Sequence, residues 1–137
     1  MIEFQTPHYK RYILSFAQKV LTQDHWDTQA AVERINRNAR LDKSLEALEQ
    51  GDGYRVERAA GFPAFEVLRV TLDAGSEFSF GMNGAYALVM TIYGDVAVNG
   101  TPLAPEAALL LPASMEAALI AAASPGCLLL AFPRSDR

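Results

Sequence analysis

Residues 65–98, FEVLRVTLDAGSEFSFGMNGAYALVMTIYGDVAV, decide the fold of this chain. Within this stretch Leu68, Val70 and Leu72 alternate with polar residues, and Phe78 and Phe80 follow the same rule. Side chains on a β-strand point to opposite faces in turn, so a period of two predicts strands with one buried face. In the third run of the stretch, one face carries Tyr86, Leu88, Met90 and Ile92.

The same pattern continues on both sides of this stretch. Asn99-Gly100 is a strong signal for a hairpin turn, and Tyr93-Gly94-Asp95 indicates a bend. About eight short strands at regular spacing predict a mainly β protein, a jelly-roll sandwich. The strands are expected at 54–59, 65–72, 77–80, 86–92, 95–98, 107–111, 117–122 and 127–132.

The first 53 residues have a helical period instead. Thr6-Pro7 can open one helix, and Asp27 can cap a second that carries Ala31, Val32 and Ile35. Asp42 can open a third short helix with Leu45 and Leu48 inward, ended by Gly51-Asp52-Gly53. The predicted organisation is a helical N-terminal segment at 1–53 and a jelly-roll domain at 54–137.

Composition narrows the class of protein. The chain has 137 residues, of which half are hydrophobic, and a net charge of −4. From Ala59 to Pro133 the only basic residue is Arg69, so we expect no nucleic acid as a partner. The N-terminal sequence has neither a basic leader nor a long apolar run, and Cys127 is the only cysteine. We therefore expect no membrane span, no disulfide within the chain, and a cytoplasmic location.

The spacing of residues 75–117 resembles the metal-binding motifs of cupins, a family of small jelly rolls. Gly75 and Gly94 stand at the two glycine positions of the first motif. The positions that carry His, His and Glu in that family are occupied here by Gly81, Asn83 and Ala87.

The second cupin motif is incomplete in the same way. Glu106 and Pro112 match it, but Ala117 stands where the family has His. Divalent metals need several imidazole or carboxylate donors at one point, and Gly and Ala supply none. The resemblance therefore implies a cupin-like fold with a degenerate site, and we expect neither a metal nor another cofactor.

A closer resemblance covers about three fifths of the chain. Residues 65–72, 94–96 and 107–113 look like the C-terminal jelly-roll domain of type I mannose-6-phosphate isomerases. In that family the zinc ligands and catalytic groups belong to the other, N-terminal jelly roll. The resemblance implies a metal-free, non-catalytic module, and no functional residue of that family has a matching position here.

Apolar side chains take the place of the missing ligands inside the roll. Such a cavity is either packed shut as core or open as an apolar pocket for a small molecule. The candidates for lining a ligand pocket are Phe78, Phe80, Met82, Tyr86, Met90 and Met115.

The last three predicted strands lack the alternation of the earlier ones. Residues 107–112, 117–123 and 127–132 contain no charge. A strand that is apolar on both faces is normally covered on both faces. We expect a homodimer, with the N-terminal helices helping to cover the sheet. A preceding domain in a longer protein is a further expected partner, because residues 2–5 read as an extended segment that leads directly into a helix.

Three function classes fit these observations. The first is a structural or dimerising cupin-like module, and the second is a cupin that binds a sugar or an apolar small molecule or has a regulatory role. The third is a sugar-phosphate isomerase-like enzyme with an unusual site, in which His25, between Asp24 and Asp27, would act as a base. His8 and His25 are 17 positions apart without a third partner, so they do not predict a metal site.

Overall fold

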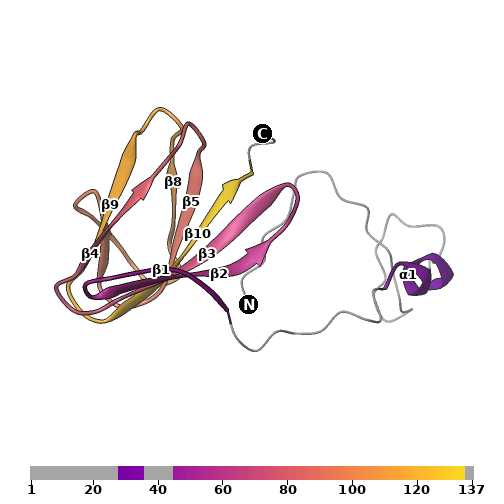
Figure 1. The fold of residues 1–137 in the computed structure, drawn as a ribbon, viewed down its shortest axis with the longest axis horizontal. Coiled ribbons are helices and arrows are strands. Elements are labelled where there is room, and N and C mark those ends of the chain that lie inside the picture. Colours follow the sequence, from indigo (N-terminus) through magenta and orange to yellow (C-terminus); the bar gives the residue numbers. More distant parts are fainter. Residues whose placement is uncertain (1–27, 36–44, 135–137) are drawn as a thin grey trace. The chain divides into compact units, whose positions relative to one another are not determined.

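The computed structural model describes residues 28–35 and 45–134 of the chain (Figure 1). The chain divides into two units, and the described part of the first consists of helix α1 (Thr28–Arg34) and Ile35. This short helix lies where the second of the three helices was predicted but ends before Ile35, and by itself it does not establish the predicted helical N-terminal segment. The first predicted helix lies outside the described residues. Among the described residues, no helix has the length and apolar character needed to cross a bilayer.

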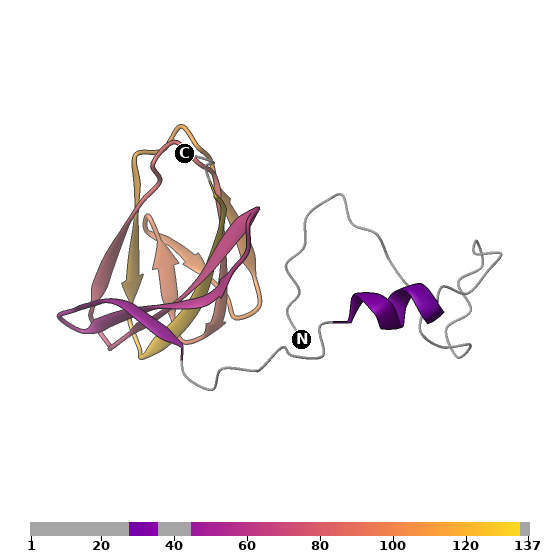
Figure 2. The same ribbon diagram turned by 45° about the vertical axis from the view of Figure 1, so that its right-hand side comes forward.

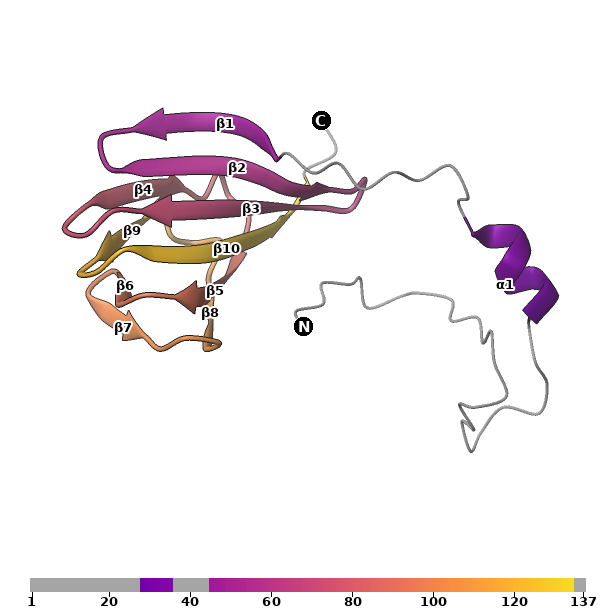
Figure 3. The same cartoon turned by 90° about the horizontal axis from the view of Figure 1, so that it is seen from below.

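The second unit is a β-sandwich of two antiparallel sheets. The larger sheet has the strand order β1-β2-β3-β10-β5-β8, and the smaller one has the order β4-β9-β6-β7. Figure 2 shows the strands curving around a common interior, and Figure 3 shows β1, β2, β3 and β10 side by side. The strands are β1 (Glu46–Gly51), β2 (Tyr54–Gly61), β3 (Phe65–Leu72), β4 (Glu77–Gly81), β5 (Ala87–Tyr93), β6 (Val96–Val98), β7 (Thr101–Leu103), β8 (Ala108–Leu111), β9 (Ala117–Ala122) and β10 (Gly126–Pro133).

One hydrophobic core lies between the two sheets. Val70 on β3 and Leu128 on β10 are register partners, and both are completely buried. Ile120 supplies the facing side from the smaller sheet and is equally inaccessible. Leu68, Val70 and Leu72 on β3 are all buried, as the predicted alternation requires, and Val67 is buried in addition to them. The Asn99-Gly100 hairpin turn is also confirmed, since both residues have the positive φ angles (49° and 76°) of such turns.

The third predicted helix is wrong, because residues 46–51 form β1. This strand pairs with β2 across a tight turn, so the sandwich includes residues that the sequence assigned to the helical segment. All six residues of β1 are exposed, including Leu48. An edge strand without a buried face has no period of two, and its charged side chains suit an unpaired edge. The short strand β7 was also not predicted.

The inward face of β5 is the opposite of the one expected. Val89 is completely buried and pairs with the equally buried Leu130, so this side faces the core. Tyr86 is 50% exposed, and Met90 shares its face of the sheet. Both faces of β5 are apolar in sequence, so only the register with its neighbours decides which one is inside.

Candidate functional site

A pocket of about 370 Å³ lies where the C-terminal ends of β4 and β10 meet. Its apolar floor is formed by Phe80, Met82 and Phe132. Its polar rim carries Glu66 and Arg134, with Asn83 from the turn after β4. This position is the same end of the sandwich at which the metal motif was located by spacing.

Side chains from both sheets make the floor. The rings of Phe80 on β4 and Phe132 on β10 have centroids 5.4 Å apart and are inclined at 47°. Tilted aromatic pairs of this kind are favourable beyond the area that they bury. Met82 is only 2% exposed and belongs to the hydrophobic core. The floor is therefore continuous with the core, and its shape is fixed by the packing of the two sheets.

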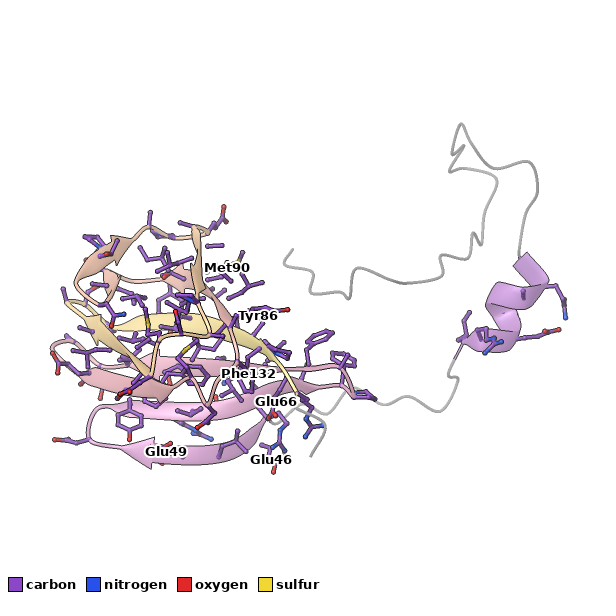
Figure 4. The ribbon with its side chains drawn as sticks, turned by 90° about the horizontal axis from the view of Figure 1, so that it is seen from above. Glu46, Glu49, Glu66, Tyr86, Met90 and Phe132 are labelled. Carbon is purple, nitrogen blue, oxygen red and sulfur yellow. The ribbon has the colours of Figure 1, made fainter. Side chains whose placement is uncertain are left out.

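The two charged residues of the rim, Glu66 and Arg134, belong to an alternating series of four charges that continues outside the pocket. Glu66, whose side chain is 12% exposed, accepts a 2.6 Å hydrogen bond from Nε of Arg58, and Nη1 of Arg58 also contacts Glu46. Nε of Arg134 lies 3.6 Å from the second carboxylate oxygen of Glu66. The hydrogen bond to Glu66 raises the pKa of Arg58 above its ordinary value, with a smaller contribution from Glu46. Figure 4 shows Glu66 close to Phe132, its register partner, and Glu46 nearby.

Most of the positions that the motif assigns to metal ligands do not face the interior of the sandwich, because the inward positions lie one residue away. Gly81 and Ala117 are register partners in the exposed row of the smaller sheet, so neither position faces the interior. A Cβ atom at Gly81 would meet nothing within 4 Å. Asn83 is exposed in a turn with φ of 48°, and only Ala87, completely buried, points into the core.

The residues that do face inward at this end do not fit a divalent metal ion. Beside Ala87 they include Phe80, Met82 and Ala118, which offer one thioether and no imidazole or carboxylate. Within residues 28–35 and 45–134 no group of three or more His, Cys, Asp or Glu side chains could hold a metal. His8 and His25 lie outside the described residues.

Of the six predicted pocket residues, the structure brings two into the pocket, namely Phe80 and Met82. Phe78 is core, with its ring 5.0 Å from that of Tyr54. Met115 packs against the core elsewhere, with its sulfur 3.3 Å from Nδ2 of Asn99. The remaining two, Tyr86 and Met90, lie on the outer face of the larger sheet.

That outer face carries a contiguous apolar patch, which we define as Leu88, Met90, Ala108, Leu110 and Leu129. Leu110 pairs with Leu88, and Met90 pairs with both Ala108 and Leu129. Leu110 is 59% exposed and Leu88 is 40% exposed. The patch therefore runs across β8, β5 and β10, beginning at the edge strand.

An ion-pair cluster adjoins the apolar patch on the same face. Arg69, the register partner of Leu129, donates from Nε (2.9 Å) and Nη2 (2.5 Å) to one carboxylate oxygen of Glu57. Nη2 of Arg55 lies 3.0 Å from the other oxygen. Glu57 is 4% exposed, so its charge is balanced by two arginines rather than by water.

A larger but shallower groove of about 620 Å³ crosses the outer face of the smaller sheet. Its centre is one cross-strand row of Glu77, Ala121, Ala97 and Pro102. Most side chains in this row are small, so the row forms a depression in the surface. The charged residues that line the groove are Glu77 and Asp95. It has no converging polar groups comparable to the rim of the first pocket.

Several solved structures with a similar fold carry the name cupin. The KdgF protein of a Halomonas species is 18% identical with a TM-score of 0.54, and 74% of this chain covers 93% of that one. An RmlC-like cupin from Shewanella frigidimarina is 14% identical with a TM-score of 0.57, with 72% and 91% covered. A sugar phosphate isomerase of the cupin superfamily from Silicibacter pomeroyi is 21% identical with a TM-score of 0.57, with 71% and 76% covered.

At these identities the likeness concerns the fold and not the activity. No protein-family model matches the chain. No curated protein matches it either. The order of the strands, the two sheets and these structural relatives agree, and the sandwich of this chain has the cupin fold.

Proposed function

We propose that this chain is a metal-independent, cytoplasmic cupin-fold module with a structural role, which joins two copies of the chain into a homodimer. The proposal follows the resemblance of residues 65–72 and 107–113 to the metal-free C-terminal domain of mannose-6-phosphate isomerases. The inward residues Phe80, Met82 and Ala118, which supply no metal-binding set, support the metal-independent part. The apolar patch supports the dimer.

The exposure of Leu88 and Leu110 carries the proposal. They are register partners on β5 and the edge strand β8, and exposed apolar side chains that adjoin one another mark interaction surfaces. The patch has no charge, so two copies that face each other across it bring no like charges together. The nearest charges on this face, Arg69 and Glu57, pair with each other, and Arg55 on the far side of Glu57 leaves this cluster with one net positive charge outside the patch. A second copy of the chain is therefore the occupant that the patch fits best.

The contribution of the patch to dimer stability can be estimated from the exposed fractions of Leu88 and Leu110. Leu110 and Leu88 together expose about as much as one whole leucine side chain. Burying a leucine completely contributes about 1.5–3 kcal/mol, so a symmetric dimer would gain about 3–6 kcal/mol from the two copies. Loss of this contribution corresponds to a rise in Kd of about 10²- to 10⁴-fold.

The test measures the molar mass of the full chain by sedimentation equilibrium over a dilution series. We expect a dimer that the double variant L88Q/L110Q converts into a folded monomer. The matched control is L119Q, because Leu119 is 45% exposed on the smaller sheet. A monomer at all concentrations, or a dimer that L88Q/L110Q does not weaken, would contradict the proposal. Elemental analysis of protein purified without chelator should find well below one equivalent of any transition metal.

The second candidate function is small-molecule binding, and the pocket at the ends of β4 and β10 favours it. Its volume of about 370 Å³ lies in the usual range of ligand pockets, about 300–1,000 Å³. An apolar floor with a few converging polar groups is the common composition of such sites. A ligand-induced rise in Tm would support this function.

A further inference from the structure

We infer that this pocket binds a small molecule that combines an apolar body with a single carboxylate, and that Arg134 holds the carboxylate. This inference rests on the second candidate function and names its ligand class. It is independent of the dimer, which involves the outer face of the sheet.

The alternating charges at the rim favour a ligand with a negative charge. Glu46, Arg58, Glu66 and Arg134 alternate in charge, and the last two line the pocket, with Arg134 at the end of the series. The two inner contacts are short, whereas Nε of Arg134 is 3.6 Å from Glu66. Among the described residues, the other hydrogen bond of its guanidinium goes from Nη1 to the backbone oxygen of Phe62 and is 3.5 Å long. Arg134 is therefore the least neutralised member, and an anion would continue the alternation.

A cationic ligand fits the rim less well. Of the carboxylates in the described part of the chain, Glu66 alone lines the pocket, and it already accepts a 2.6 Å hydrogen bond from Arg58. An ammonium group would have to compete with this charge-assisted bond, which is among the stronger kinds in proteins. A carboxylate displaces nothing of that strength, since it needs only the guanidinium of Arg134, which can bind carboxylates through two parallel N–H groups.

The floor selects the rest of the ligand. Phe80 and Phe132 present two tilted rings with Met82 beside them, and none of the three side chains has a charged group. A volume of about 370 Å³ is at the small end of ligand pockets, which suits a body of about one ring. Asn83 on the rim can donate to or accept from a second polar group of the ligand.

The experiment compares two probes that differ only in charge. Phenylacetate and phenylacetamide are titrated into the ¹⁵N-labelled full chain, and binding is followed by the backbone amide resonances of Met82 and Phe132. We expect phenylacetate to bind about three- to tenfold more tightly, as for a charge-assisted hydrogen bond to a half-exposed guanidinium. R134Q should abolish this preference, and R134K should keep part of it. R55Q is the matched control, because Arg55 is exposed on the other face of the sheet and should leave the preference unchanged.

Any other result contradicts either the carboxylate assignment or the small-molecule function as a whole. Equal affinity for both probes, or a preference that R134Q preserves, would refute the carboxylate assignment while the pocket remains a binding site. If neither probe shifts the resonances of Met82 or Phe132 in the folded wild-type chain, the small-molecule function fails together with the inference. Far-UV circular dichroism of each variant separates loss of binding from loss of folding.

Discussion

Glu57 provides the sharpest test of how the larger sheet is held together. Its carboxylate is 4% exposed and is bound by Arg69 from β3 and by Arg55 from its own strand. Removal of the charge in Glu57→Gln leaves two guanidinium groups next to a neutral amide. Hydrogen bonds to charged groups contribute about 1.5–3 kcal/mol each.

The expected loss of stability is smaller than this range, because both arginines are partly exposed to water. The side chains of Arg69 and Arg55 are 42% and 50% exposed, so water recovers part of the lost interaction. About 1 kcal/mol for each arginine gives about 2 kcal/mol for Glu57→Gln and about 1 kcal/mol for Arg69→Gln. The double variant should cost about 2 kcal/mol rather than 3, since Arg69 has little left to lose once Glu57 is neutral.

The assay is urea denaturation at pH 7, followed by far-UV circular dichroism, with comparison of midpoints at a constant m-value. Glu77→Gln serves as the control, because Glu77 is an exposed carboxylate on β4 and should change stability by less than about 0.5 kcal/mol. If the effects of Glu57→Gln and Arg69→Gln add within about 0.3 kcal/mol in the double variant, the two residues are not coupled and the reasoning is refuted.

Three other perturbations have defined outcomes. Leu130→Ala empties a completely buried position and should cost about 2–5 kcal/mol in the same urea assay. Gly94→Ala should lower Tm by several degrees or prevent folding, because φ is 92° and the new Cβ would lie 2.5 Å from Cα of Gly126; an unchanged Tm would contradict this turn geometry. Burial raises the pKa of the Cys127 thiol above its ordinary 9.0, with Arg69 lowering it and Glu57 raising it by smaller amounts. The folded state then keeps a proton that the unfolded state loses, so the free energy of unfolding should fall as the pH rises above about 9, and fall less steeply in Cys127→Ala.

The sequence predicted the buried face of a strand correctly where the other face is polar. In β3 the polar positions Arg69 and Thr71 separate buried ones, and the assigned face was right. In β5 both faces are apolar, and the outward set around Met90 could not be told from the inward set around Val89. The pairing of Val89 with Leu130 decides between them, and pairing is a property of the assembled sheet.

The pocket shows the same limit. Phe80 and Met82 were predicted to line the pocket because they lie next to the metal motif. The same motif placed a metal ligand at Gly81, which is exposed. Glu66 and Phe132 are 66 positions apart and meet only because β3 and β10 pair in a particular register. No local pattern in the sequence contains this information, so the charged rim could be found only in the structure.

The pocket has a floor and a rim of different origin, and this division has an evolutionary consequence. Phe80, Met82 and Phe132 belong to or pack against the core, so changes there alter stability together with binding. Asn83 in the turn between β4 and β5 and Arg134 just after the last strand are exposed, and substitutions at exposed positions are usually close to neutral for folding. Under the binding function proposed above, selection can therefore exchange the ligand through two surface positions while the scaffold that orients it is inherited unchanged.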